Sequence, residues 1–567
     1  MLKRTCLWAA VIMSLNAWAQ MPHEVLLLVN RQSPASMKVA NTYAAARRIP
    51  ACNLVYLDIP VDLYGGTATI TPEQFTKLIW DPANAVVKER GLDSQILAWV
   101  YSVDFPIRVK TDSNDRKQMS VLGLTFVRNK LPPLDQVEKG TYQSMLFTGP
   151  NARIKDSLYG LSLDRFRDGI GESASLPADL GFLEKGLQDE MPLPSMMLGY
   201  TGENGNDVQT VLDTIERGLQ AERTEPSKGF YLVMSDDVRS KCREHLYYPL
   251  ANSIKAANDS VTITVTNQFP AGAKDVMGLM MGAETVDPSA IGSFAPGAMA
   301  EHLTSWAAEF QKPQTKLTEW LKAGATATAG TVVEPYSNPD KFASARFFYF
   351  YVSGCTMLES FYQSISCPLQ LLLLGDPLAR PYWIPFQLKL LGVDTISSGF
   401  TYIAQAQSRI WRNAFLYTYL LDGKVVQELS EEPTYYFGTY KVADGYHELR
   451  VVAYPAHAAH IGISVEKAVV VNKKNRSVSI PAREIEKTGE HVHSVKIQVG
   501  GNEQPVKVRL VCGALMLDEQ PYTADVVLTL DELKLGEGPS RIQAVAVYAD
   551  GMEVASSPLN ITIAYTP

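Results

Sequence analysis

The sequence predicts a mainly parallel α/β domain that is flanked by helices and followed by two all-β sandwiches. Up to about residue 385, short apolar runs bounded by Gly, Pro, Asp or Asn alternate with helical patterns, which is typical of a parallel sheet. After Pro385, short segments of alternating polarity are separated by frequent turn signals, which is typical of sandwiches. The chain has 567 residues, which is too long for a single core.

Two sets of elements are expected before Pro385. The apolar runs expected to form buried strands are 25–29, 54–57, 96–103, 230–234, 276–281, 327–333 and 371–374. The helical patterns cover 33–47, 72–88, 207–223 and 237–256. The segment 105–194 is rich in Asp, Arg, Gly and Pro and interrupts the alternation, so it is expected to be an insertion or lid within an α/β domain of residues 20–385.

Immunoglobulin-like sandwiches are expected in the second part of the chain. Segments such as LYTYLLDG, YHELRVVAY and VKVRLVCG alternate with period 2, as strands with one buried face do. A basic link at 473–476 and a charged stretch at 483–490 divide these strands into two modules. We therefore expect sandwiches at 386–484 and 485–567.

The N-terminus has the pattern of a secretory signal peptide. Lys3 and Arg4 precede an apolar run at 7–15, and Ala17 and Ala19 form an A-x-A site, so residues 1–19 are expected to be removed. No later segment has the ~18 uninterrupted apolar residues of a transmembrane helix. The sequence thus predicts an exported protein, periplasmic or extracellular, without a transmembrane segment.

Net charge, cysteine content and the spacing of possible metal ligands each argue against one class of protein. A formal net charge of -8 provides no field that would attract nucleic acid. Five cysteines follow the expected signal peptide, too few for a disulfide scaffold, although a bridge between Cys355 and Cys367 is left open. No His, Cys or carboxylate spacing predicts a metal site of the zinc type.

Four blocks of the α/β part carry a family resemblance. They read VNRQSPASMKVANTYAAARRIPACNLVYLDIP, APGAMAEHLTS, KAGATATAGTVVEPY and MLESFYQSISCPLQLLLLGDPLARPY. In these blocks the chain resembles an uncharacterised family of secreted bacterial proteins. The last two, a glycine-punctuated strand, a helix and an apolar strand ending in Gly-Asp-Pro, resemble the caspase and gingipain type of cysteine peptidase.

The resemblance implies where a catalytic pair would stand. Such peptidases carry a His-Gly at the end of one strand and a nucleophilic Cys at the end of the next. Here the first position falls at Met281-Gly282, and the second falls between Phe294 and Ser305, where there is no cysteine. Because a thioether cannot act as a base, the resemblance predicts a degenerate peptidase fold that has lost its catalytic pair.

Three residues remain as candidates for catalysis. Ser305 follows a strand-like run, with His302 three residues before it, but in an extended strand the two side chains face opposite ways. Cys355 precedes a helix, whose dipole would lower a thiol pKa, but it follows the glycine-rich strand, and a buried structural thiol is the favoured interpretation of its position.

Acidic residues follow several of the expected strands. Asp104, Glu334 and Asp376 stand where the carboxyl ends of parallel strands would meet, which is where ligands bind in doubly wound sheets. Converging carboxylates there would favour a basic peptide side chain or a calcium ion. Calcium is the one cofactor that the sequence suggests. The alternative is that each acid caps the helix that follows it.

These observations predict an exported, non-catalytic binding or assembly protein. The partners considered are a peptide, a protein or a polysaccharide at the cell surface. The alternative is a secreted hydrolase, a peptidase with an unrecognised nucleophile such as Ser305 or Cys355.

Overall fold

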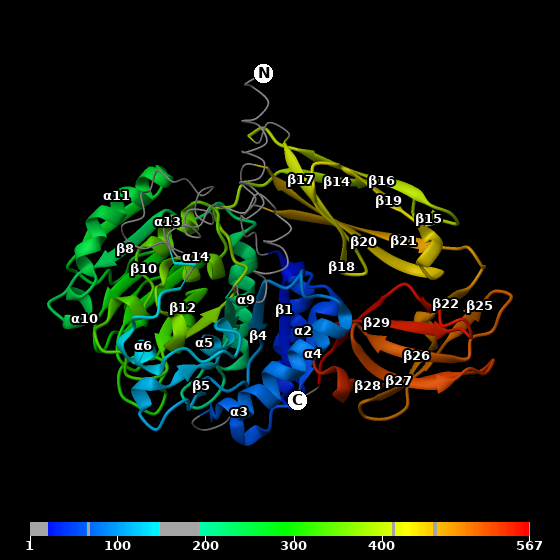
Figure 1. Ribbon diagram of the computed structural model, residues 1–567, viewed down its shortest axis with the longest axis horizontal. Helices are drawn as coiled ribbons and strands as arrows, with labels where there is room; N and C mark the ends of the chain where they lie inside the picture. The colour runs from blue at the N-terminus through cyan, green and yellow to red at the C-terminus, as the bar shows by residue number, and fades with distance from the viewer. Residues whose placement is uncertain are drawn as a thin grey trace. The chain divides into compact units, whose positions relative to one another are not determined.

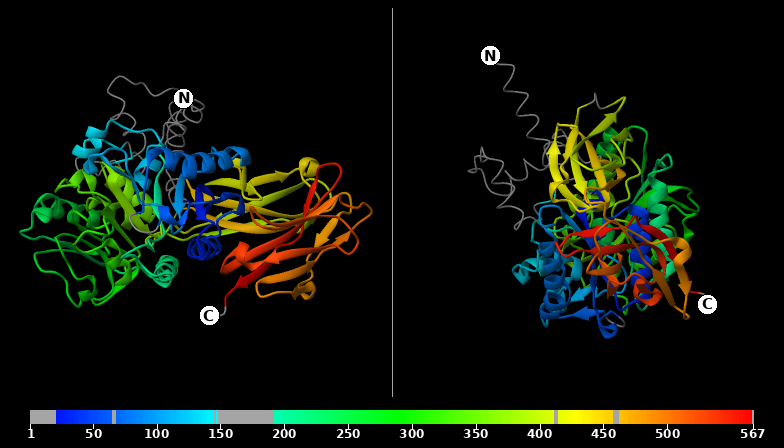
Figure 2. Two further views of the ribbon diagram at one scale, coloured as in Figure 1. Left: turned by 90° about the horizontal axis from the view of Figure 1, so that it is seen from below. Right: turned by 90° about the vertical axis from the view of Figure 1, so that its right-hand side faces the viewer.

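The computed structural model describes residues 21–64, 68–144, 146–147, 192–410, 414–456 and 462–565. The expected signal peptide, residues 1–19, lies outside the described residues, and so do residues 145 and 148–191 of the expected insertion. The chain forms two compact units (Figures 1 and 2). One comprises the described residues up to Val39 and Leu57–Ile384, and the other comprises Ala40–Tyr56 and the residues from Pro385 onward.

A ten-stranded sheet lies mainly in the first unit, in the order β2-β1-β4-β7-β13-β12-β11-β10-β8-β9. The strands are β1 Val25–Asn30, β2 Leu54–Leu57, β4 Ala98–Tyr101, β7 Ser195–Met197, β8 Gly229–Val233, β9 Thr262–Thr266, β10 Val276–Gly282, β11 Phe294–Leu303, β12 Ala327–Thr331 and β13 Leu371–Gly375. A small separate sheet contains β3 Thr69–Ile70, β5 Arg108–Val109 and β6 Met119–Ser120.

The predicted α/β fold class is confirmed, and every expected strand of this part is present. The short β7 and the polar β9 were not expected, because neither has an apolar run long enough to stand out from its surroundings. β11 was not among the apolar runs named above and was expected only as the strand-like run before Ser305. The core strands are buried along their whole length, as the unbroken apolar runs of β1, β10 and β13 require.

The strand directions divide the sheet into two halves. β1, β4, β7 and β13 run parallel to one another, and so do β12, β11, β10, β8 and β9. The halves meet where β12 pairs antiparallel with β13, with Ala327 opposite Gly375 and Thr331 opposite Leu371. The carboxyl ends of the two sets of strands therefore lie at opposite edges of the sheet, where each edge is formed by strand ends and not by an outermost strand.

Helices flank this sheet (Figure 1). They are α2 Pro34–Arg47, α3 Pro72–Phe75, α4 Asp81–Arg90, α5 Val121–Phe126, α6 Leu134–Lys139, α9 Val208–Ala221, α10 Val238–Lys241, α11 Tyr247–Ala257, α12 Leu317–Lys322, α13 Arg346–Val352 and α14 Met357–Ser364. A π-helical turn, Thr76–Trp80, joins α3 to α4, so the helix expected at 72–88 is one run. The helix expected at 237–256 is broken, because Arg243 leaves the helical conformation with φ -130°.

From Pro385 onward, the second unit is built from strands that pair mostly antiparallel, which confirms the all-β part of the prediction. Its strands are β14 Gln387–Leu391, β15 Thr395–Ile396, β16 Phe400–Gln407, β17 Phe415–Leu421, β18 Lys424–Ser430, β19 Thr434–Phe437, β20 Gly445–Pro455, β21 Ile463–Val471, β22 Ser477–Ser479, β23 Ile485–Lys487, β24 Val492–Lys496, β25 Gln498–Gly500, β26 Lys507–Cys512, β27 Leu515–Pro521, β28 Val527–Asp531, β29 Gly538–Val547, β30 Glu553–Ala555 and β31 Leu559–Ile563. A short helix, α15 Glu532–Leu535, follows β28.

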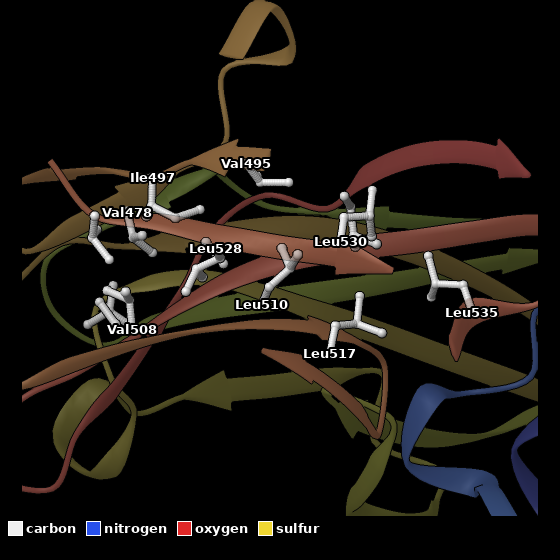
Figure 3. Close-up of a cluster of buried hydrophobic side chains, with 14 of the residues drawn as sticks. Val478, Val495, Ile497, Val508, Leu510, Leu517, Leu528, Leu530 and Leu535 are labelled. Carbon is white, nitrogen blue, oxygen red and sulfur yellow. The ribbon is translucent and has the colours of Figure 1, made fainter. Parts of the chain in front are cut away.

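The last part of this unit has a core of its own. Val495, Leu510, Leu528 and Ile542 are fully buried, and they belong to one apolar cluster that extends from Val478 to Ile563. Figure 3 shows labelled side chains of this cluster, Leu510 and Leu528 among them, gathered between the strands. Alternate residues of β26, β28 and β29 include Leu510, Leu528 and Ile542, as the period-2 pattern predicted, and β24 supplies Val495.

Cys355 and Cys367 are both buried thiols without a disulfide, so the bridge left open between them is not formed. Among the described residues, no helix combines the length and apolar character that crossing a membrane requires.

Gly375 lies where the two halves of the sheet join, and its position does not tolerate a side chain. Its φ of 128° is unfavourable for a residue with a side chain, and a Cβ would lie 2.1 Å from the carbonyl oxygen of Thr326. We predict that Gly375→Ala lowers the free energy of unfolding by about 2 kcal/mol or more, measured by urea denaturation. Gly229→Ala is the matched control, because the nearest atom to its Cβ is 3.9 Å away. Equal losses in both variants would contradict this account of Gly375.

Candidate functional site

The ends of β10 and β11 are where the resemblance places a catalytic pair. The two strands are parallel, with Met281 beside His302 and Gly282 beside Leu303. Thr304 and Ser305 follow β11 directly, so the two positions inferred from the resemblance do lie next to each other in space. Met281 is only 6% exposed, and its thioether offers no proton acceptor for a base.

Main chain from the α10 segment closes the end of β10. A Cβ on Gly282 would lie 2.2 Å from the carbonyl carbon of Arg239 and 2.3 Å from the amide nitrogen of Ser240. The hydroxyl of Ser235 also donates to the carbonyl oxygen of Gly282 at 3.2 Å. Glycine at position 282 therefore allows the backbone of α10 to contact the end of β10 directly.

A buried ion pair reinforces this closure. The guanidinium of Arg243 lies 2.8 Å from the carboxylate of Glu301 on β11, and neither side chain is more than 3% exposed. Arg243 also donates to the carbonyl oxygens of Met281 and, at 3.1 Å, Ala343. Burial raises the pKa of Glu301, and the charge of Arg243 opposes that rise. Removing one partner would leave a buried charge unpaired, which is far more costly than removing both.

His302 faces away from this pair and bonds to a tryptophan. The indole nitrogen of Trp320 donates to Nδ1 of His302 at 2.8 Å, and the ring is 1% exposed. Burial, with Arg243, Lys316 and Arg239 contributing further, lowers the pKa of His302 to about 3. The ring is therefore neutral with its proton on Nε2, which has no hydrogen-bond partner among the described residues.

Ser305 is half-buried at the start of a loop that its neighbours hold in place. Its carbonyl oxygen accepts from the hydroxyl of Thr331 at 3.2 Å. Thr304 donates to the side-chain oxygen of Gln314 at 2.6 Å, and the Trp306 amide donates to the same atom at 3.1 Å. Because Nδ1 of His302 is bonded to Trp320, His302 does not act as the base of Ser305.

Cys355 is a buried thiol. It is 3% exposed, and burial together with the nearby carboxylate of Glu359 raises its pKa well above the usual value. The side-chain amide of Gln363 donates to its sulfur at 3.8 Å. The position before α14 does not lower the pKa as a helix dipole would, because desolvation is the larger effect here.

The three acids expected at one edge are divided between two. Asp104 follows β4 and Asp376 follows β13, and these strands run in the same direction. Glu334 follows β12, which runs in the opposite direction. Glu334 therefore lies at the other edge, where its carboxylate accepts from the amide of Tyr336 at 2.9 Å.

Asp104 and Asp376 each bond to protein groups. Asp104 has a left-handed φ of 58°, and its carboxylate accepts from the hydroxyls of Ser33 and Thr201. Asp376 is fully buried, lies against Gly218 and accepts from the amide of Leu378 at 3.1 Å. Within the described ranges, no group of three or more His, Cys, Asp or Glu side chains could hold a metal ion.

Arg243, Glu301 and Trp320 are the residues that sequence reasoning missed. The available signal was the Glu301-His302 dipeptide inside an otherwise apolar buried strand, since buried charges are normally paired. Nothing in the sequence identified the partners of this dipeptide. Arg243 comes from the connection between β8 and β9, and Trp320 comes from α12.

Comparisons with known proteins give a partial likeness. No protein-family model matches the chain, and no curated protein matches it. A solved structure of a protease is similar at 10% identity over 80% of this chain and 98% of that one, with a TM-score of 0.38.

Two other solved structures share a smaller part. SGBP-B of a Bacteroides ovatus mixed-linkage glucan utilisation locus, in complex with a heptasaccharide, matches at 15% identity over 31% of this chain, with a TM-score of 0.21. Dimeric latent PorU of Porphyromonas gingivalis matches at 12% identity over 32% of this chain, with a TM-score of 0.14. This chain spans 44% and 20% of their respective lengths. TM-scores below 0.5 do not assign a function to this chain.

His302 predicts a specific dependence of stability on pH. Its folded pKa of about 3 lies below the ordinary value of 6.5, so the unfolded chain binds a proton that the folded chain does not. This contribution is complete above pH 6.5 and is lost as the pH falls toward 3, by about 1.4 kcal/mol per pH unit. In urea titrations between pH 7 and pH 4, His302→Phe and His302→Gln should both show a shallower loss. Slopes identical to that of the wild type would contradict a neutral, buried His302.

Calcium provides a test of the acidic edge. Because Asp104 and Asp376 already bond to protein groups and Glu334 lies at the other edge, millimolar calcium should leave the melting temperature unchanged relative to EDTA. A ligand that binds the native state raises it by mass action. A calcium-dependent rise that disappears in Asp104→Asn would restore the cation site.

Proposed function

We propose that this chain is an exported, non-catalytic binding or assembly protein built on a degenerate cysteine-peptidase-like fold. The proposal rests on the closed ends of β10 and β11. Met281 stands where the resembled peptidases carry a histidine, and the backbone of Arg239 and Ser240 contacts Gly282 directly. The range in which the resemblance places the nucleophilic cysteine, Phe294 to Ser305, contains no cysteine.

The chemistry of the remaining candidates supports the absence of catalysis. Nucleophilic attack on an amide requires a thiolate or hydroxyl next to a base that can accept its proton. The raised pKa of Cys355 keeps it a thiol at neutral pH, and the neutral ring of His302 accepts its hydrogen bond from Trp320. Cys355 therefore provides no thiolate, and His302 provides no base for it.

Export is proposed from the N-terminal pattern of Lys3, Arg4 and Ala19, with the periplasm or the extracellular space as the destination. A surface in the second unit supports partner binding. On the three-stranded sheet β14-β16-β19, Tyr436 is 66% exposed opposite Thr401, and Leu391 and Ile403 form an exposed pair. Nearby, Tyr440 is 87% exposed. Exposed tyrosines with apolar neighbours are enriched at binding surfaces, and a peptide, a protein or a polysaccharide would suit such a face.

Hydrolysis assays test the proposal directly. The purified chain should cleave casein and a fluorogenic peptide library no faster than buffer does, and Ser305→Ala and Cys355→Ala should give the same trace. Cys367→Ala is the matched control, because this thiol is equally buried and was not a catalytic candidate. Cleavage by the wild type that is lost in folded Ser305→Ala or Cys355→Ala, but kept in Cys367→Ala, would establish the alternative of a secreted hydrolase.

A further inference from the structure

The strand β9 (Thr262–Thr266) ends the ten-stranded sheet on one side. Among the described residues it pairs only with β8, in parallel, with Gly229 beside Thr262 and Tyr231 beside Thr264. The register is regular over the whole strand. Its side chains are exposed or half-buried, whereas Val55 and Leu57 of β2, at the other end of the sheet, are almost completely buried.

The backbone of β9 has one bonded side and one open side. The Thr262 amide donates to the carbonyl oxygen of Lys228, and the Thr266 carbonyl accepts from the amide of Met234, both at 2.7 Å. Thr262, Thr264 and Thr266 therefore direct their amides and carbonyls toward β8. Because these groups alternate along a strand, those of Ile263 and Val265 point outward, where no strand lies in the described part of the chain.

β9 lacks the features that normally keep a free edge from pairing. Natural edge strands carry charges, proline or bulges. β18 is such a strand, with Lys424, Glu428 and an irregular register against β17. β27 has Asp518, Glu519, Pro521 and an irregular register against β26. By contrast, β9 reads TITVT, without a charge, a proline or a bulge.

We propose that β9 pairs antiparallel with β9 of a second copy of this chain, about a two-fold axis at Thr264. The sequence TITVT is nearly the same in both directions, so the strand is complementary to itself. An interface with two-fold symmetry requires such self-complementarity. This inference does not depend on whether the α/β unit is catalytic.

The register of this pairing follows from the open groups. With Thr264 opposite Thr264 of the second copy, Ile263 faces Val265 of the second copy, and both residues direct their amides and carbonyls at each other. Each such pair exchanges both N–H···O=C bonds. Threonine pairs then lie on one face of the joined sheet and β-branched apolar pairs on the other, and both kinds of pair stabilise antiparallel strands.

A cysteine at the axis tests the register. The Thr264 pair is a non-hydrogen-bonded one with its Cα atoms about 4.5 Å apart, which is within the range that a disulfide spans. Under mild oxidation, Thr264→Cys should give a covalent dimer on a non-reducing gel. The control is Thr262→Cys, because its equivalent in the second copy would lie about 13 Å away. Equal crosslinking of both variants, or of the unmodified chain, would overturn the register.

Charge at the axis tests the dimer itself. Light scattering coupled to size-exclusion chromatography should show the unmodified full chain as a dimer at micromolar concentrations. Thr264→Lys and Thr264→Glu, each opposing its own charge, should be monomers at the same concentration, with dissociation constants raised at least about tenfold. An equimolar mixture of the two should dimerise again, because opposite charges then face each other.

Thr262→Lys is the control for charge alone, since its lysine faces Thr266 of the second copy, and this variant should remain dimeric. Circular dichroism checks that each variant is folded. The proposal is overturned if the unmodified chain is monomeric up to about 100 μM, if Thr264→Lys stays dimeric, or if the mixture stays monomeric.

Discussion

The antiparallel pairing of β12 with β13 is the constraint on which the α/β unit depends. It joins two sets of parallel strands that run in opposite directions, so the carboxyl ends of the strands lie at two edges of the sheet instead of one. Asp104 and Asp376 lie at one of them, and Glu334 and the ends of β10 and β11 lie at the other. Ligand sites in doubly wound sheets form where carboxyl ends of strands converge, and here that convergence is divided between the two edges.

Protein groups contact one another at the edge where the sequence resemblance places a catalytic pair. Gly282 admits the backbone of Arg239 and Ser240, and Arg243 bonds to both Met281 and Glu301. A catalytic cleft needs a reactive pair and an open space next to it. At this edge Arg243 and Glu301 form a buried ion pair, and Trp320 bonds to His302, so these side chains contact protein groups.

The positions of the strands could be predicted from the sequence because buried runs such as LLLLG and VMGLMMG are unambiguous. Their directions could not, since direction depends on which strands pair, and Leu374 of β13 pairs with Met197 of the distant β7. The misplacement of Glu334 followed from this. The ion pair of Arg243 with Glu301 was also beyond reach, because Arg243 belongs to a segment whose pattern is helical but whose helix breaks at that residue.

The order of the strands in the chain has a consequence for how the protein is made. β13 comes last of the ten in the sequence, yet it lies between β7 and β12 in the sheet. Until residue 375 has left the ribosome, the N-terminal strands and the β8–β12 group have no shared partner, and each keeps a bare inner edge. A chain with this strand order cannot finish its central sheet early in synthesis, so these two inner edges stay unpaired until the last strand of the sheet is made.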